Sequence, residues 1–135
     1  MHSRIAVTIT PSLSHTVFYL ESVTQGRIQR GDYVLFPLAH PVTQDLGFTR
    51  TIKEVACVGG QSLVVSGKDY YCDGMFLGTA KAYSLKGAKV KSFSFSGVIP
   101  KGFLFVIGHH KDSFDSRYFG LIREQDVEKI ARPLI

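Results

Sequence analysis

The sequence predicts a mostly β, antiparallel fold with at most a few short helical turns. Nearly every periodic stretch repeats its apolar residues with period two, the spacing of a strand that buries one face. Thirteen Gly and five Pro favour tight turns between such strands. With 44% hydrophobic residues, the 135-residue chain can bury a core, and its length suits a single domain over residues 1–135.

The first third of the chain contains three predicted strands. Ile5–Thr10 alternates apolar and polar residues until Pro11 removes a backbone donor. A second extended run covers His15–Leu20, and Gly31–Pro37 joins a turn to an apolar strand. The following residues, Ala39–Arg50, have the composition of a loop.

The next predicted strand, Thr51–Val58, carries a lysine among apolar residues. In an extended chain Lys53, Val55 and Cys57 point to one face, and Ile52 points to the other. A lysine in this setting commonly extends its amine to water. If the amine cannot reach water, desolvation lowers its pKa and makes it a candidate general base. The strand pattern leaves both alternatives open.

The middle of the chain predicts a hairpin. Ser62–Ser66 and Asp69–Cys72 are strand-like runs that a Gly-Lys turn separates. Gly74–Gly87 is ambiguous between strand and helix, whereas Lys91–Ser96 alternates strictly and places its two phenylalanines on one face.

A polar loop after the most apolar run organises the last third. Phe103–Ile107 is too short to span a membrane and predicts a buried strand. In the loop 108–120 that follows, Asp115 and Arg117 stand two apart, so their side chains can pair on one side of an extended chain. A short strand is expected at Leu121–Ile122. The spacing of apolar residues in Asp126–Ala131 then predicts one helical turn.

Charge and cysteine content restrict the function only weakly. The net charge of +5 permits nucleic acid or an anionic membrane surface as a partner, and we interpret it as a weak indication of a membrane surface. The lysines are dispersed rather than in one block: Lys81, Lys86, Lys89, Lys91 and Lys101. The chain has neither an apolar run of membrane-spanning length nor a signal peptide. Cys57 and Cys72 fit one disulfide or two buried thiols, and their number and spacing do not suggest zinc.

Three motifs resemble those of the Ser/Lys-dyad signal peptidases, most closely the small conjugative-transfer (TraF-type) branch that processes pilin precursors. They occur in the family's order over nearly the whole chain: Thr10-Pro-Ser-Leu13, then Ile52-Lys-Glu-Val-Ala56 with Gly59-Gly60, then Gly97–Gly108 followed by Ser113–Gly120. Two positions depart from the family pattern. Ser14 stands where the family usually has Pro, and Gln61 where it usually has Asp.

The resemblance implies a catalytic dyad of Ser12 and Lys53. Neutral Lys53 would take the proton from the Ser12 hydroxyl, which attacks a peptide carbonyl to give an acyl-enzyme. The Ser12 backbone N–H and the Thr10 hydroxyl would form the oxyanion hole. Leu13 and Ile52 would line the pocket for the small side chain before the cleaved bond.

The resemblance also assigns roles within the loop after Phe103–Ile107. Ser113 would orient the lysine, and Asp115 and Arg117 would brace the loop. The implied fold is a signal-peptidase-type coiled antiparallel β assembly, and the chemistry requires neither a cofactor nor a metal.

The implied cellular setting is the bacterial inner membrane, with the catalytic domain on the periplasmic side, where disulfides persist. The family carries a membrane helix directly before the serine motif. Only eleven residues precede Ser12, so we expect that helix to be missing from this chain.

The expected partner is a pilin precursor or another exported polypeptide, bound in extended form at an exposed edge strand, and nucleic acid is not expected. The acyl-enzyme would be resolved by water or by the substrate's own amino terminus to give a cyclic pilin, and the sequence leaves both open.

Rival interpretations account for less of the sequence. A self-cleaving repressor would need a DNA-binding module and an internal Ala-Gly cleavage site, and the sequence has neither. A Ser–His hydrolase that used His15 would normally have a Gly-x-Ser-x-Gly turn, which this sequence lacks. Adjacent residues such as His109 and His110 point apart in an extended chain, which disfavours a metal site. The alternative from another class is a basic β-barrel that binds single-stranded nucleic acid, with three stacking platforms: Tyr70, Phe93 and Phe95.

Overall fold

The structure is a computed structural model that describes residues 4–7, 17–38, 50–84 and 86–134. Within these ranges the chain forms antiparallel strands with one short α-helix and one 3-10 turn. The elements are β1 (Arg4–Val7), β2 (Val17–Glu21), β3 (Tyr33–Pro37), β4 (Arg50–Val58), β5 (Ser62–Ser66), β6 (Asp69–Cys72), β7 (Met75–Thr79), β8 (Ser96–Val98), β9 (Phe103–Ile107), α2 (Ser116–Phe119), β10 (Ile122–Arg123), η1 (Glu124–Asp126) and β11 (Lys129–Pro133).

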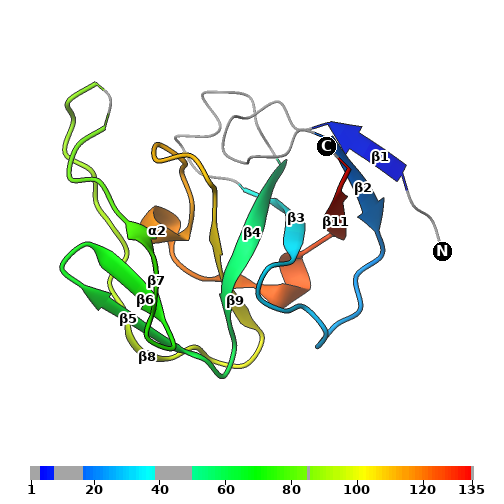
Figure 1. Ribbon diagram of the computed structural model, residues 1–135, viewed down its shortest axis with the longest axis horizontal. Coiled ribbons are helices and arrows are strands. Elements are labelled where there is room, and N and C mark those ends of the chain that lie inside the picture. Colours follow the sequence, from blue (N-terminus) through cyan, green and yellow to red (C-terminus); the bar gives the residue numbers. More distant parts are fainter. Residues whose placement is uncertain (1–3, 8–16, 39–49, 85, 135) are drawn as a thin grey trace.

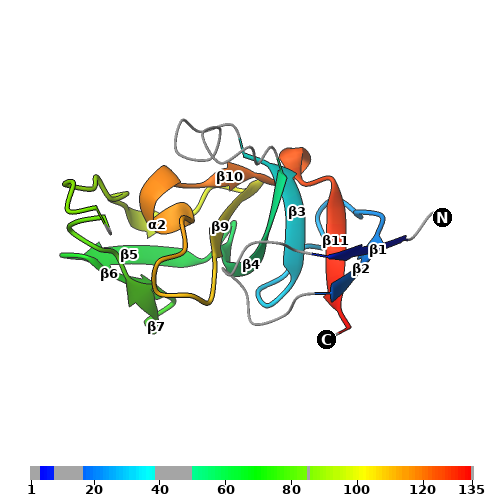
Figure 2. The same cartoon turned by 90° about the horizontal axis from the view of Figure 1, so that it is seen from above.

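The strands form two sheets that lie side by side (Figures 1 and 2). The larger has seven strands in the order β1-β2-β11-β3-β4-β9-β10, and the smaller has four in the order β7-β6-β5-β8. β4 and β9 stand between the small sheet and the rest of the large sheet (Figure 1). The predicted mostly β, antiparallel class is confirmed.

A β-bulge in β4 divides its side chains between two parts of the core. Val55 pairs with Val106, whereas Cys57 pairs with Phe105, so Ala56 is an extra residue in the ladder. Val55 packs in one core cluster with Val106, and Cys57 packs in another with Phe105. The prediction that Cys57 shares the face of Val55 is therefore wrong, because the bulge reverses the alternation between them.

A disulfide between Cys57 and Cys72 ties β4 of the large sheet to β6 of the small sheet. The two Cα atoms are 5.8 Å apart and both residues are fully buried. Of the two alternatives for the cysteines, the structure has the cross-link. In the chain-entropy model, closing a loop of this length stabilises the fold by about 3 kcal/mol.

The C-terminal segment is a strand where the sequence predicted a helical turn. β11 lies between β2 and β3, and its Ile130 and Ala131 are 8% and 1% exposed. The helix-like spacing in Asp126–Ala131 was misleading, because a strand inside the sheet buries residues on both of its faces. The helical turn occurs slightly earlier, as η1.

Two other predicted segments differ from the structure in extent. The strictly alternating run Lys91–Ser96 enters a strand only at its last residue, although Phe93 and Phe95 do lie together, with ring centroids 5.9 Å apart. The ambiguous segment after Gly74 begins with a strand, β7. The described part of the first predicted strand, Ile5–Val7, lies in β1. None of the helices in the described ranges is long and apolar enough to cross a bilayer.

Candidate active site

Lys53 is a buried lysine in the middle of the large sheet. It pairs with Val34 of β3, and residues directly opposite each other share a face, so its side chain lies on an apolar surface. The residue is 4% exposed. Burial lowers the pKa of Lys53 from 10.5 to about 8, because desolvation penalises the charged amine. Of the two alternatives for this lysine, the structure has the desolvated one.

The Lys53 amine is held by a serine 60 residues later in the chain. Lys53 Nζ donates a hydrogen bond of 3.1 Å to Ser113 Oγ, and Ser113 is 5% exposed. Ser113 in turn donates its backbone N–H to the carbonyl of His110 at 3.0 Å. The amine is thereby fixed in one direction by a residue of the loop that follows β9.

Asp115 and Arg117 form a bidentate ion pair inside this loop. Arg117 Nε donates to Asp115 Oδ1 at 2.9 Å, and an η nitrogen donates to Oδ2 at 2.8 Å. The carboxylate also accepts the backbone N–H of Arg117 at the start of α2 and that of Gly108 at the end of β9. Asp115 is fully buried, and these four bonds tie the carboxylate to both ends of the loop.

The guanidinium reaches outside its own loop to the small sheet. An η nitrogen of Arg117 donates to the carbonyl of Thr79, at the end of β7, at 2.9 Å. A Cβ added at Gly78 would lie 3.5 Å from that nitrogen, an ordinary van der Waals contact, so the guanidinium runs close beside the backbone of β7. Arg117 therefore joins the loop that holds Lys53 to the end of β7.

Tyr70 of β6 contacts the same loop through its hydroxyl group. Its hydroxyl lies 2.8 Å from the carbonyl oxygen of Arg117 and 2.6 Å from that of Phe93, so its one proton serves both acceptors. The ring is fully buried, and burial raises the pKa of the Tyr70 phenol. Since no face of this ring is accessible, it cannot stack on a base as the nucleic-acid interpretation required.

The ion pair places both signs of charge near the amine of Lys53. Desolvation is the largest cause of its lowered pKa; the Asp115 charge raises the pKa, and the Arg117 charge lowers it. Because the pair is neutral as a unit, the effect of burial prevails. An amine with a pKa of about 8 is neutral in a small but useful fraction of molecules at physiological pH, and that fraction can accept a proton.

The remaining predicted residues are only partly placed. Ile52 lies on the other side of β4 from Lys53, 5% exposed, and packs with Phe18, Leu20 and Ala131. The predicted nucleophile, oxyanion and pocket residues Ser12, Thr10 and Leu13 lie outside the described residues. The described part of the chain contains no group of His, Cys, Asp and Glu that could hold a metal ion.

The contacts of Thr79 and Tyr70 were not predicted from the sequence. Thr79 contributes only a backbone carbonyl, which every residue has. Tyr70 was considered for its aromatic face, but the structure uses its hydroxyl. A signal for the burial of Tyr70 was available in the predicted strand Asp69–Cys72, because residues two apart in a strand share a face, and Tyr70 and Cys72 are both buried.

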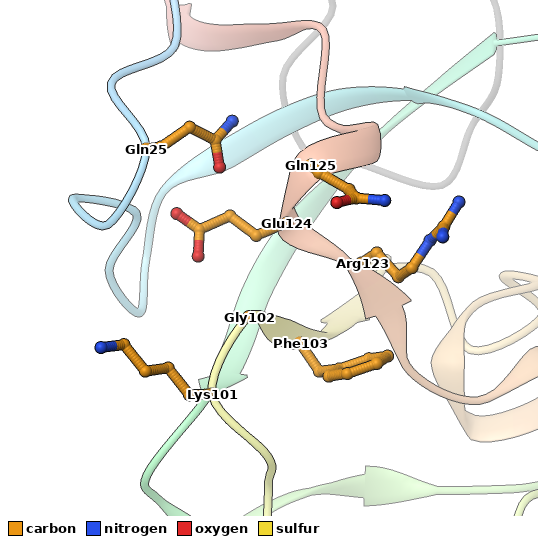
Figure 3. Close-up of a pocket in the computed structure, with 7 residues that line it drawn as sticks. All are labelled: Gln25, Lys101, Gly102, Phe103, Arg123, Glu124 and Gln125. Carbon is orange, nitrogen blue, oxygen red and sulfur yellow. The ribbon is translucent and has the colours of Figure 1, made fainter.

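A cleft of about 380 Å³ lies at the other end of β9 from the Ser113 loop (Figure 3). Polar side chains from the turns surround its opening: the cleft is lined by Gln25, Lys101, Gly102, Phe103, Arg123, Glu124 and Gln125. Neither Lys53 nor the Asp115–Arg117 pair borders this cleft, so it is separate from the candidate active site.

Comparison with known proteins relates this chain to signal peptidases in both sequence and fold. The sequence model of the family described as signal peptidase, peptidase S26, matches residues 5–134. The conjugal transfer protein TraF of Agrobacterium fabrum is 34% identical over 89 residues, which are 64% of this chain and 49% of that protein. The chain thus spans about half the length of this curated relative. The crystal structure of a signal peptidase I from Enterococcus faecalis shares the fold, with a TM-score of 0.50 and 24% identity over 79% of this chain and 98% of that one.

Proposed function

Because the chain belongs to the signal peptidase family, peptidase S26, we propose that it is a serine peptidase that cleaves an exported polypeptide with Lys53 as its general base. The observation that carries the proposal is the buried Lys53 amine, with its pKa of about 8 and its hydrogen bond to Ser113. At pH 7 about one molecule in ten has the neutral amine, compared with about one in three thousand at a pKa of 10.5. A base of this strength can be regenerated at neutral pH.

In the proposed reaction Lys53 takes the proton of the Ser12 hydroxyl as the serine oxygen attacks the peptide carbonyl. The Ser12 N–H and the Thr10 hydroxyl stabilise the oxyanion, and the protonated amine gives its proton to the leaving amine. Water, or the amino terminus of the substrate, then attacks the acyl-enzyme. Ser113 keeps the amine directed towards the reacting atoms, and the Asp115–Arg117 pair keeps Ser113 in place.

The proposed substrate binds as an added strand along the first half of β4. Within the described residues, β4 pairs with β9 only from Glu54 to Val58, so Arg50–Lys53 have no strand on that side. An extended peptide hydrogen-bonded there would run beside Lys53. Leu13 and Ile52 are proposed to shape the subsite for the residue before the cleaved bond.

The cellular role that we propose is processing of a pilin precursor in conjugative transfer, at the periplasmic side of the inner membrane. The support is the similarity to a protein named conjugal transfer protein TraF. The disulfide fits an oxidising compartment, because disulfides persist outside the cytosol.

The test is cleavage of a purified conjugative pilin precursor, followed by mass spectrometry. Ser12→Ala, Lys53→Ala and Lys53→Arg should each abolish cleavage, the last because a guanidinium does not become neutral. Lys101→Ala, at an exposed lysine in the β8–β9 turn, should cleave like wild type. A cyclic product would be lighter than the linear one by one water. Wild-type turnover in any of the three active-site variants would contradict the dyad.

The pH dependence of the same reaction tests the base. The rate should rise with pH and level off above about 8, as Lys53 loses its proton. A rate that stays constant from pH 6 to 9 would argue against a titrating lysine.

A further inference from the structure

The chain between β7 and β8 forms a basic hairpin, defined here as residues 80–92. The hairpin lies within a long stretch, residues 74–111, that contains no Asp or Glu but six lysines. In Figure 1 the hairpin rises past α2 and projects from the body of the protein. Among the described residues, no acidic side chain pairs with Lys86, Lys89 or Lys91.

The pairing of the hairpin puts its aromatic and basic side chains on one face. Tyr83 and Lys89 form an antiparallel bridge, with Ser84 N–H donating to the Ala88 carbonyl and Val90 N–H to the Ala82 carbonyl. Directly opposite residues share a face, and so do residues two apart in an extended strand. Tyr83 and Lys89 therefore point to the same side, where Tyr83 is 61% exposed, and Lys91, which is also exposed, follows two residues after Lys89.

The base of the hairpin is attached to the loop that holds Lys53. Lys81 forms an ion pair with Asp112, the neighbour of Ser113, and donates its backbone N–H to the Tyr118 hydroxyl at 3.0 Å. On the other side of the hairpin, Phe93 N–H donates to the Arg117 carbonyl at 2.8 Å. These contacts place the base of the hairpin beside Asp112 and α2, next to Ser113.

We propose that Tyr83, Lys89 and Lys91 form a recognition surface for an acidic segment of the polypeptide substrate, beside the catalytic loop. This inference rests on the proposed peptidase function. The carboxylates of the segment pair with the two lysines, and the Tyr83 ring contacts its aliphatic groups. The segment is held away from the cleaved bond and adds affinity without taking part in the chemistry.

The arrangement of the lysines favours an extended peptide over an anionic bilayer. Residues two apart in a strand are about 6.6 Å apart, and an extended peptide presents its own alternate side chains at the same repeat. Lys89 and Lys91 can therefore meet two acidic residues at alternate positions. The base of the hairpin is also attached to Asp112, the neighbour of Ser113, so the proposed substrate would pass close to this surface.

The test is an NMR titration of the isotope-labelled protein with a synthetic peptide that has Glu at every second position, and with its twin that has Gln instead. The double variant K89A/K91A removes the two lysines. The matched control K101A/K129A removes the same charge from lysines outside the hairpin. The measurements are repeated at low and high salt, and the sedimentation of each protein with phosphatidylglycerol-containing vesicles is measured in parallel. Binding does not require turnover, so failure of this inference is separate from failure of the proposed peptidase activity.

The wild type and the control should bind the Glu peptide about three- to tenfold more tightly than the Gln peptide, as expected for two exposed ion pairs. The largest shifts should be at the amides of residues 83, 89 and 91. The preference should disappear in K89A/K91A and weaken at high salt. The inference is overturned if the wild type binds both peptides equally, or if the control loses the preference as fully as K89A/K91A. It is also overturned if K89A/K91A loses vesicle binding while its peptide preference is unchanged.

Discussion

The buried lysine should give the protein a specific dependence of stability on pH, which Lys53→Met removes. Methionine keeps an unbranched side chain at position 53 but cannot bind a proton. In the folded protein the pKa of Lys53 is about 8, whereas in the unfolded chain it returns to about 10.5. The difference in unfolding free energy between wild type and Lys53→Met should therefore change with pH between these values.

The sign follows from counting protons. Below pH 8 the lysine is protonated in both states, and the full cost of burying its charge destabilises the wild type. Between pH 8 and 10.5 the unfolded chain binds the proton and the folded protein does not, so wild-type stability rises with pH relative to Lys53→Met. Each pKa unit corresponds to about 1.4 kcal/mol, which gives a total change of about 3 kcal/mol.

Urea denaturation at several pH values from 6 to 10.5 measures this difference. Lys101→Met, at an exposed lysine, should differ from wild type by an amount that hardly changes with pH. Loss of the Ser113 hydrogen bond and changes in packing shift the Lys53→Met values equally at every pH, so only the slope is diagnostic. If the Lys53→Met difference is constant from pH 7 to 10, Lys53 is not desolvated and the argument for a neutral base fails.

Three further predictions concern the surrounding structure. Arg117→Ala should lower the unfolding free energy by about 3–5 kcal/mol, because it leaves the buried carboxylate of its partner unpaired. By the same measurement Arg123→Ala, which breaks an exposed ion pair, should cost less than about 1 kcal/mol. Ser113→Ala should melt close to wild type, since the lost hydrogen bond is worth about 1 kcal/mol, but should process substrate at least about tenfold more slowly because the amine is released; full activity would show that the loop has only a structural role. A double Cys57→Ala, Cys72→Ala variant should be less stable by about 3 kcal/mol, and the denatured, unreduced wild type should contain no free thiol.

Much of the fold could be predicted because a strand with one buried face has a simple pattern. Ser62–Ser66 and Asp69–Cys72 have the predicted bounds, since a Gly-containing turn separates two short alternating runs. The bulge in β4 could not be predicted in this way. An extra residue in a ladder leaves no trace in a strand whose residues before and after it are all apolar, and it decides which face Cys57 occupies.

The candidate site could be predicted only as far as local pattern and family resemblance allow. The spacing of Asp115 and Arg117 predicted that they could pair along an extended chain; they do pair, but across the first turn of α2, where Asp115 is the N-cap. The alternation around Lys53 placed its side chain among apolar residues. The contact between Lys53 and Ser113 joins residues 60 positions apart, and no local pattern connects them. Only the resemblance to the signal peptidases pointed to Ser113.

The ion pair next to the lysine explains how the loop can be rigid without weakening the base. A carboxylate alone could accept the same backbone N–H groups, but its charge would raise the pKa of Lys53 and keep the amine protonated. Arg117 brings a compensating charge, which lowers that pKa, and it also ties the loop to the carbonyl of Thr79. Arginine suits this position because its guanidinium remains charged when buried and pairs with both carboxylate oxygens. The pair therefore holds Ser113 against the amine while burial still determines that the amine loses its proton near neutral pH.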